Sequence, residues 1–252
     1  MVGVKSLKHK IKAVLFDIGG TLEKLRADPA IRQKTYLSLH NFLVKNGINI
    51  DIQEMIEMIQ SGFKRYSEWR NETLREAKPE EIWTNYVFGK VHYIDKQKIK
   101  RISPKLCEIY ENGYYERKLR NEALDMLRAL KNMNFKLGCV SNAISPVLER
   151  NLKKYEIRRF FDVVILSCNF GFRKPHPAIF NEALHSMHVE AGESVFVGDT
   201  ILKDVIGAKK AGFRYVILTR SILTENDEIV QKIKPDYIVN SLNEIPILLK
   251  EL

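Results

Sequence analysis

The stretch Ala13-Val14-Leu15-Phe16-Asp17-Ile18-Gly19-Gly20-Thr21 determines the fold that we expect for this chain of 252 residues. A short apolar run ends at the carboxylate of Asp17, and two glycines and a hydroxyl follow. A buried strand that stops at Asp places the carboxylate at the carboxyl edge of a parallel sheet, where open α/β folds bind their ligands. The glycines let the backbone turn sharply and come close to whatever Asp17 binds. The stretch therefore predicts a ligand site at the end of the first strand.

Strand-like and helix-like segments alternate through the second half of the chain. The expected strands cover residues 136–140, 163–166, 194–197, 215–218 and 237–239, and the run 12–16 has the same character. The expected helices cover residues 122–133, 146–155, 177–187, 202–211, 226–232 and 242–249. Such alternation with short connections is typical of right-handed crossovers and of a parallel sheet covered on both faces. We therefore expect an α/β fold with a Rossmann-like, doubly wound parallel sheet.

Residues 26–115 have a different pattern, with almost no strand signal. The helices expected there cover residues 31–45, 52–76, 80–91 and 96–110. Asp28-Pro29 predicts a helix start, with Asp as the cap and Pro at the first helical position. We expect an α-helical cap domain, residues 26–115, inserted into an α/β core that consists of residues 1–25 and 116–252.

Composition and charge exclude several classes of protein. The apolar runs are far shorter than a bilayer span, and the N-terminus lacks the pattern of a secretory signal, so we expect no membrane partner. The net charge is +10, but the basic residues are spread along the chain and mixed with acids. This distribution favours anionic substrates over nucleic acid. Cys107, Cys139 and Cys168 match no metal or redox spacing, which indicates reduced thiols in the cytoplasm. The sequence gives no oligomeric state.

Four short segments with reactive side chains end or follow expected strands: residues 17–21, 141–142, 174–175 and 198–204. In a parallel sheet all four reach the same edge. Carboxylates such as those of Asp17, Asp199 and Asp204 suit Mg²⁺, which keeps several waters for a phosphate to displace. A lysine and a serine hydroxyl, here Lys174 and Ser141, suit a phosphoryl group. Asp17 could then act as a nucleophile, forming an acyl phosphate that water hydrolyses.

Four motifs, in this order, resemble those of the haloacid dehalogenase-like hydrolase superfamily over the whole chain. They are Phe16-Asp17-Ile18-Gly19-Gly20-Thr21-Leu22, Val140-Ser141-Asn142, Arg173-Lys174-Pro175-His176-Pro177 and Val197-Gly198-Asp199-Thr200-Ile201-Leu202-Lys203-Asp204. The helical insertion between the first two motifs is similar to the cap that many members carry there. Because four motifs agree in order and position, the resemblance is highly specific.

The resemblance implies a role for each matching residue. Asp17 would be the covalent nucleophile, and Lys174 would both bind the transferring group and offset the charge of the carboxylates. The substrate-binding residues would be Thr21, Ser141, Asn142 and Lys174. The Mg²⁺ ligands would be Asp17, the backbone carbonyl of Gly19 and Asp199, with Asp204 bound directly or through water.

Gly19 departs from the pattern of the family's phosphatases. These carry an Asp at this position, which protonates the leaving oxygen and then activates water, and such help is typically worth about 10²–10⁴ in rate. Its absence leaves three alternatives: a slow or specialised phosphatase, a metal-independent 2-haloacid dehalogenase, or a protein that binds without turnover. Three carboxylates without a cation would have raised pKa values and would repel a carboxylate substrate. The acidic residues therefore favour a Mg²⁺-dependent phosphatase of a small phosphorylated metabolite, acting through an aspartyl-phosphate.

Other polar and aromatic residues have simpler interpretations. His185 and His188 share a helix face without further ligands at metal spacing, which indicates a surface or half-buried pair. His176 could replace the missing acid, but a polar helix-start residue is the favoured interpretation. Several residues of the cap could line the pocket, although aromatics at helical spacing more often form a core. They are Phe63, Tyr66, Trp69, Arg70, Trp83 and Tyr86.

Overall fold

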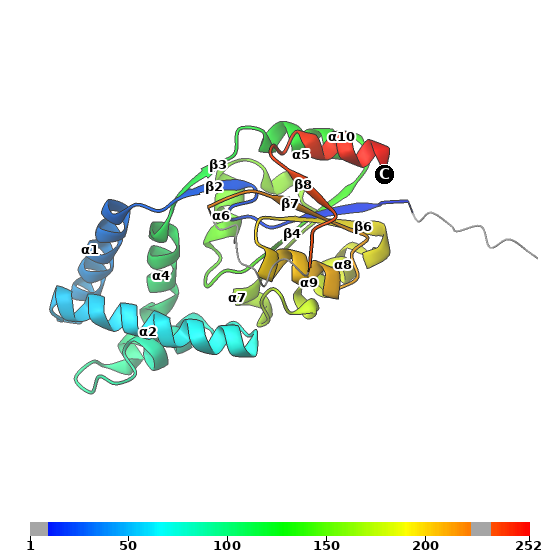
Figure 1. Ribbon diagram of the computed structural model, residues 1–252. Helices are drawn as coiled ribbons and strands as arrows, with labels where there is room; N and C mark the ends of the chain where they lie inside the picture. The colour runs from blue at the N-terminus through cyan, green and yellow to red at the C-terminus, as the bar shows by residue number, and fades with distance from the viewer. Residues whose placement is uncertain (1–9, 223–232) are drawn as a thin grey trace, which may run out of the picture.

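A six-stranded parallel sheet forms the centre of the molecule in the computed structural model, which describes residues 10–222 and 233–252. The strand order is β5-β4-β1-β6-β7-β8 (Figure 1). The strands are β1 (Ala13–Phe16), β4 (Lys136–Ser141), β5 (Val163–Leu166), β6 (Ser194–Gly198), β7 (Tyr215–Thr219) and β8 (Tyr237–Val239). Each lies within one residue of its expected bounds, so the predicted parallel α/β sheet is confirmed.

Helices cover both faces of the sheet because the side chains of β1 alternate between two apolar clusters. Val14 and Phe16 pack on one side, and Ala13 and Leu15 pack on the other. The first cluster includes residues of α5 (Ala123–Asn132), α6 (Val147–Lys154) and α10 (Glu244–Glu251). The second includes residues of α8 (Pro177–Met187) and α9 (Ile206–Lys210), and α7 (Ser167–Phe170) follows β5 directly. Figure 1 shows α5 and α10 on one side of the sheet and α8 and α9 on the other.

The helical insertion packs around an apolar core of its own beside the sheet (Figure 1). Its helices are α1 (Pro29–Lys45), α2 (Ile52–Thr73), α3 (Pro79–Glu81) and α4 (Lys96–Tyr114). The side chains of Asp28, Asp51 and Asp95 accept hydrogen bonds from the first backbone N–H groups of α1, α2 and α4, which fixes where these helices begin. Tyr66 and Trp83 are fully buried in this core. We call the insertion the cap.

The structure corrects the expected elements in three places. A short antiparallel ribbon of β2 (Glu23–Arg26) and β3 (Glu116–Leu119) joins the cap to the core, where no strand was expected. The expected helix 80–91 is α3 followed by a π-helical turn, Ile82–Val87. The expected helix 202–211 begins as a second π-helical turn, Ile201–Val205, before α9. The helix expected over residues 226–232 lies outside the described residues.

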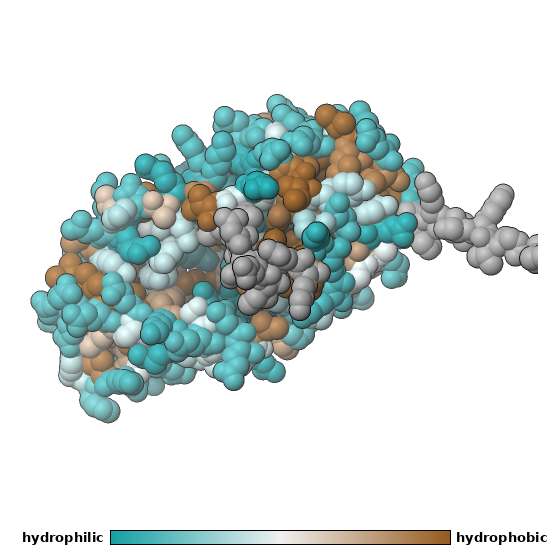
Figure 2. All heavy atoms as spheres, viewed as in Figure 1, coloured by the Kyte–Doolittle hydropathy of each residue, from teal (hydrophilic) through white to brown (hydrophobic). Residues whose placement is uncertain are grey.

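The visible surface is largely hydrophilic, with apolar side chains scattered over it (Figure 2). Within residues 10–222 and 233–252, no helix is both long and apolar enough to cross a membrane.

Candidate active site

The ends of three adjacent strands bring the predicted site residues together. Asp17 follows β1, Ser141 ends β4 and Asp199 follows β6, and β1 lies between β4 and β6 in the sheet. The backbone N–H of Asp17 donates to the carbonyl of Val197 at 2.9 Å, which extends the pairing of β1 and β6 to the first site residue. Lys174 arrives from the loop before α8. Residues far apart in the sequence therefore face one another at the carboxyl edge of the sheet.

The carboxylate of Asp17 is held by two donors. The hydroxyl of Ser141 donates to Asp17 Oδ1 at 2.9 Å, and Lys174 Nζ donates to the same oxygen at 2.6 Å. Lys174 Nζ also donates to Asp204 Oδ1 at 2.6 Å. All of these side chains are buried, with Lys174 only 3% exposed. The ammonium group thus lies between two carboxylates and fixes their separation.

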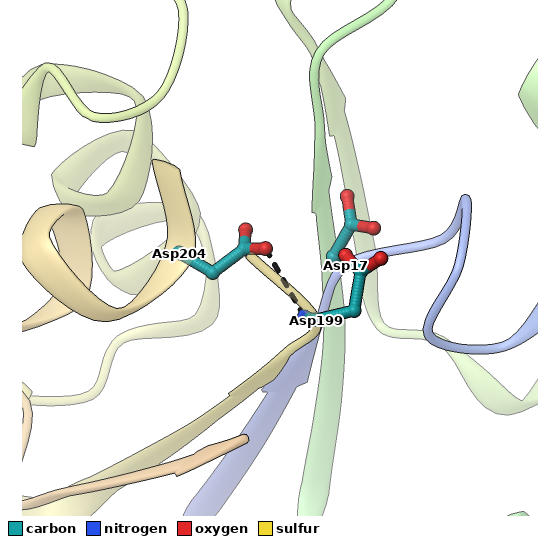
Figure 3. Close-up of side chains that lie close together, drawn as sticks. All are labelled: Asp17, Asp199 and Asp204. Atoms are coloured by element: carbon teal, nitrogen blue, oxygen red, sulfur yellow. Dashed lines mark hydrogen bonds between the residues drawn. The ribbon is translucent and has the colours of Figure 1, made fainter. Parts of the chain in front are cut away.

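Asp17, Asp199 and Asp204 form the acidic cluster of the site (Figure 3), and one oxygen of each lies within 4.8 Å of the others. Asp204 Oδ2 accepts hydrogen bonds from the backbone N–H of Asp199 and from both the N–H and the hydroxyl of Thr200. Asp199 accepts a hydrogen bond from the hydroxyl of Ser221. The loop after β6 therefore orients the carboxylate of Asp204, whereas Ser221, which lies after β7, holds the carboxylate of Asp199.

Charge is unevenly balanced in this cluster. Burial raises the pKa of Asp17, although Lys174 opposes the shift, and burial together with Asp17 and Asp204 raises the pKa of Asp199. Burial also disfavours ionised Asp204, but Lys174 and the Thr200 hydrogen bonds outweigh it and lower the pKa. One ammonium does not neutralise three buried carboxylates. A divalent cation would supply the missing positive charge, and oxygen donors at this spacing suit Mg²⁺.

Two glycines make the close approach of the carboxylates possible. A Cβ atom built on Gly20, whose φ is +97°, would lie 2.0 Å from Asp199 Oδ2. A Cβ atom on Gly198 would lie 2.3 Å from the Cβ atom of Asp204. Any side chain at either position would displace a carboxylate of the cluster.

Two of the residues predicted to bind substrate, Asn142 and Thr21, have other positions or contacts in the structure. Asn142 accepts from the backbone N–H of Lys174 at 2.8 Å and donates to the Lys174 carbonyl at 3.0 Å, so it holds the loop that carries the lysine. Thr21 is fully buried, does not line the cavity described below, and its hydroxyl has no hydrogen-bond partner among the described residues. His176 Nδ1 accepts from the N–H of Ala178 at the start of α8, in agreement with the helix-start interpretation.

A cavity of about 570 Å³ extends from the acidic cluster to the cap. Of the cap residues considered from the sequence, Phe63 and Arg70 line it, whereas Tyr66 and Trp83 belong to the core of the cap. The cavity is rich in cationic side chains, and sequence reasoning missed Arg32, Lys64 and Arg117 among them. Besides Lys174 the cationic side chains are Arg32, Lys64, Arg70, Arg117, Arg173 and Lys203. The cavity therefore favours an anionic ligand.

Two buried carboxylates of the cap reach loops of the core beside this cavity. Glu76 accepts from the hydroxyl of Ser167 at 2.6 Å and lies 3.5 Å from Arg173 Nη1. Glu111 accepts from the N–H of Ile144 at 2.9 Å and from the hydroxyl of Ser145. These loops directly adjoin Lys174 and Ser141, so the cap is connected to the segments that hold Asp17.

Comparisons with known proteins agree with this geometry. Two curated relatives, both named glyceraldehyde 3-phosphate phosphatase, come from Methanopyrus kandleri and Methanocaldococcus jannaschii. They are 26% and 28% identical to this chain over 249 residues, which covers 96% of this chain and 98% of each relative. A pyrophosphatase PpaX from Bacillus anthracis is 24% identical over 245 residues, covering 96% of this chain and 98% of that protein.

Solved structures share the fold over nearly the full length. The HAD phosphatase from Thermococcus onnurineus has a TM-score of 0.59 and 26% identity, covering 95% of this chain and 98% of that chain. The 2-haloacid dehalogenase from Pseudomonas syringae pv. Tomato DC3000 has a TM-score of 0.68 and 21% identity, covering 96% of this chain and 99% of that chain. The model of the family described as haloacid dehalogenase-like hydrolase matches residues 11–212. With the four motifs gathered around one acidic cluster, the chain belongs to the haloacid dehalogenase-like hydrolases.

Proposed function

We propose that this hydrolase is a Mg²⁺-dependent phosphatase of a small phosphorylated metabolite, acting through an aspartyl-phosphate at Asp17. The observation that carries the proposal is the buried cluster of three carboxylates around a single ammonium group. Such a cluster suits a divalent cation and a phosphoryl group far better than it suits a carboxylate substrate without metal. The phosphatase names of the relatives support the same reaction class.

The residues present fit the metal. Asp17, Asp199 and the carbonyl of Gly19 would hold Mg²⁺, with Asp204 acting directly or through water. Bound Mg²⁺ would neutralise charge and orient the oxygens of the phosphoryl group. Because Asp204 already accepts three hydrogen bonds on Oδ2 and one from Lys174 on Oδ1, we expect its main task to be orientation.

Asp17, Lys174 and Ser141 have separate roles in the proposed reaction. Asp17 attacks phosphorus with one carboxylate oxygen while the bond from phosphorus to the leaving oxygen breaks, and water later hydrolyses the acyl phosphate to phosphate and free Asp17. Lys174 and Ser141 both contact Asp17 Oδ1, so they keep the nucleophile in one orientation and lie where they can bind the transferring group. Residues of the cap line the cavity above them.

The three cysteines of the chain, Cys107, Cys139 and Cys168, are free thiols, which fits a reducing compartment, so we place the reaction in the cytoplasm.

A screen of phosphate esters and acyl phosphates tests the proposal. We expect phosphate release with Mg²⁺, loss of release with EDTA, and loss in the Asp17→Asn variant, which keeps the size of the side chain. Circular dichroism and thermal unfolding of the variant control for folding. Release that persists in Asp17→Asn would contradict the assigned nucleophile.

The same protein should be assayed for halide release from 2-chloropropionate. The structural likeness to a 2-haloacid dehalogenase is at 21% identity and concerns the fold alone. Halide release is still worth measuring, because Gly19 stands where the family's phosphatases carry an Asp. Metal-independent halide release would overturn the phosphatase assignment. Ligand-induced stabilisation without any turnover would instead indicate a protein that only binds.

A further inference from the structure

Gly19 leaves a space that Arg117 fills. A Cβ atom built on Gly19 would lie 3.3 Å from Arg117 Nη1 and 3.9 Å from Leu25 Cδ1. Gly19 is not among the glycines with positive φ, so its backbone conformation does not require glycine. The neighbouring guanidinium group is what distinguishes the position. A cationic side chain therefore stands beside the residue two places after Asp17.

The ribbon between core and cap holds Arg117 there. Leu25 in β2 pairs with Arg117 in β3, and Gly19 itself forms a bridge with Glu23. Arg117 Nη1 donates to Glu23 Oε2 at 2.7 Å, and the Glu23 side chain is fully buried. Arg117 lines the cavity together with Asp17, and its buried Nε has no hydrogen-bond partner among the described residues. The guanidinium is thus fixed on one side and has donor capacity left.

An arginine at this place cannot do what a carboxylic acid does. A guanidinium group stays protonated in proteins, so it does not give up a proton to a leaving oxygen. It can, however, stabilise negative charge through a short, charge-assisted hydrogen bond. A leaving group that departs as a stable anion needs this help and no proton.

We propose, on the basis of the phosphatase function above, that Arg117 stabilises the leaving group as an anion, which makes acyl phosphates and phosphoanhydrides the substrate class. An oxygen of Asp17 forms a bond to phosphorus, and the bond from phosphorus to the bridging oxygen breaks. The electron pair stays on that oxygen, which leaves as a carboxylate or phosphate anion paired with Arg117. No proton moves in this step. An alkyl phosphate would release an alkoxide, which is far too basic to leave in this way.

The wild-type protein should therefore discriminate steeply between leaving groups. Acetyl phosphate, 4-nitrophenyl phosphate, phenyl phosphate and glycerol 3-phosphate form a series of rising leaving-group pKa. At fixed Mg²⁺ we expect kcat/KM to fall along the series, with acetyl phosphate above glycerol 3-phosphate by about 10²–10⁴, the usual contribution of the missing acid. A flat series would overturn the proposal.

Variants assign the effect to Arg117. Arg117→Met combined with Glu23→Gln removes the cation without leaving a buried carboxylate unpaired. We expect it to lose about 10²–10³ in kcat/KM on acetyl phosphate and little on glycerol 3-phosphate, with partial recovery on added guanidinium ion. Glu23→Gln alone is the matched control and should keep the steep series. Thermal unfolding of both variants identifies any loss of structure.

A variant that should gain activity provides a second test of the proposal. Gly19→Asp in the Arg117→Met, Glu23→Gln background places a carboxyl group beside Asp17 without the neighbouring guanidinium that would keep it ionised. We expect it to flatten the series by raising the rate on glycerol 3-phosphate at least about tenfold over that background. Glu111 also lines the cavity and is the alternative proton donor. The proposal would be overturned if Glu111→Gln changed the dependence of kcat/KM on leaving-group pKa while the Arg117 variant left that dependence unchanged. Absence of phosphate release from every donor would instead refute the phosphatase function itself.

Discussion

Glu111 provides a test of how the cap is joined to the core. It lies in α4, is 9% exposed, and accepts hydrogen bonds from the Ile144 N–H and the Ser145 hydroxyl of the core loop after β4. Burial raises its pKa from 4.5 to about 7, against the opposing effect of these two hydrogen bonds. Replacing it by Gln keeps the shape and removes the ionisation. The amide oxygen still accepts from the Ile144 N–H, and the amide nitrogen donates to the Ser145 hydroxyl.

The size and sign of the effect on the unfolding free energy follow from the pKa of Glu111 in the folded and in the unfolded protein. Since the folded pKa is the higher one, the folded state holds the proton more tightly, and this stabilisation is complete only below pH 4.5. It is lost as the pH rises from 4.5 through 7, and each pH unit in that window costs about 1.4 kcal/mol of unfolding free energy. Ionisation of Glu111 therefore destabilises the folded protein by about 3 kcal/mol above pH 7.

Urea unfolding of wild type and Glu111→Gln across this pH range measures the effect. We expect the two proteins to be nearly equal in stability below pH 4.5, and the Gln variant to gain up to about 3 kcal/mol by pH 8. Glu57→Gln, at an exposed position of the cap, controls for the loss of one negative charge. A constant difference between wild type and Glu111→Gln at all pH values would refute the reasoning.

Three further predictions concern the site and its support. Gly20→Ala should abolish activity because the new Cβ would displace Asp199, whereas Gly212→Ala, also at positive φ but with only an ordinary contact at 3.6 Å, should cost about 1–2 kcal/mol and leave kcat unchanged. Arg173→Met should lower the unfolding free energy by about 3–5 kcal/mol because it leaves Glu76 buried without its cation, and denaturation that matches wild type would contradict this. Mg²⁺ should raise the melting temperature of the wild type, and Asp199→Asn should lose most of that rise; an equal rise in both would argue against Asp199 as a ligand.

Much of the core could be predicted because its signals are local. The strands of the sheet are short apolar runs, and each polar segment of the site follows one of them, so topology alone brings Asp17, Ser141 and Asp199 to one edge. The helical character of the cap was predicted from its amphipathic stretches and from Asp28-Pro29, which begins α1; the structure adds Asp51 and Asp95 as the caps of α2 and α4. Patterns of this kind depend only on neighbours in the sequence.

The ribbon that joins cap and core could not be predicted in the same way. β2 and β3 have the sequences EKLR and ERKL, which contain little apolar surface, and they become strands only because they pair across about ninety residues of chain. β2 has one apolar residue, Leu25, which is buried together with Glu23, so no apolar alternation marked it as a strand. The position of Arg117 beside Gly19 follows from that distant pairing, so nothing near either residue in the sequence indicates it. The same holds for the hydrogen bonds that Glu76 and Glu111 form with the core, although Glu76 also accepts one from Tyr66 within the cap.

The most direct test of the account is to identify the residue that carries the phosphoryl group during turnover. The protein is mixed with acetyl phosphate and Mg²⁺, quenched within one turnover, and treated with sodium borohydride, which reduces an aspartyl-phosphate to homoserine. Mass spectrometry of the peptide that contains position 17 then shows whether Asp17 was modified. The account predicts homoserine at position 17, dependent on both Mg²⁺ and acetyl phosphate. Phosphate release with an unmodified Asp17, or homoserine at another aspartate, would contradict it.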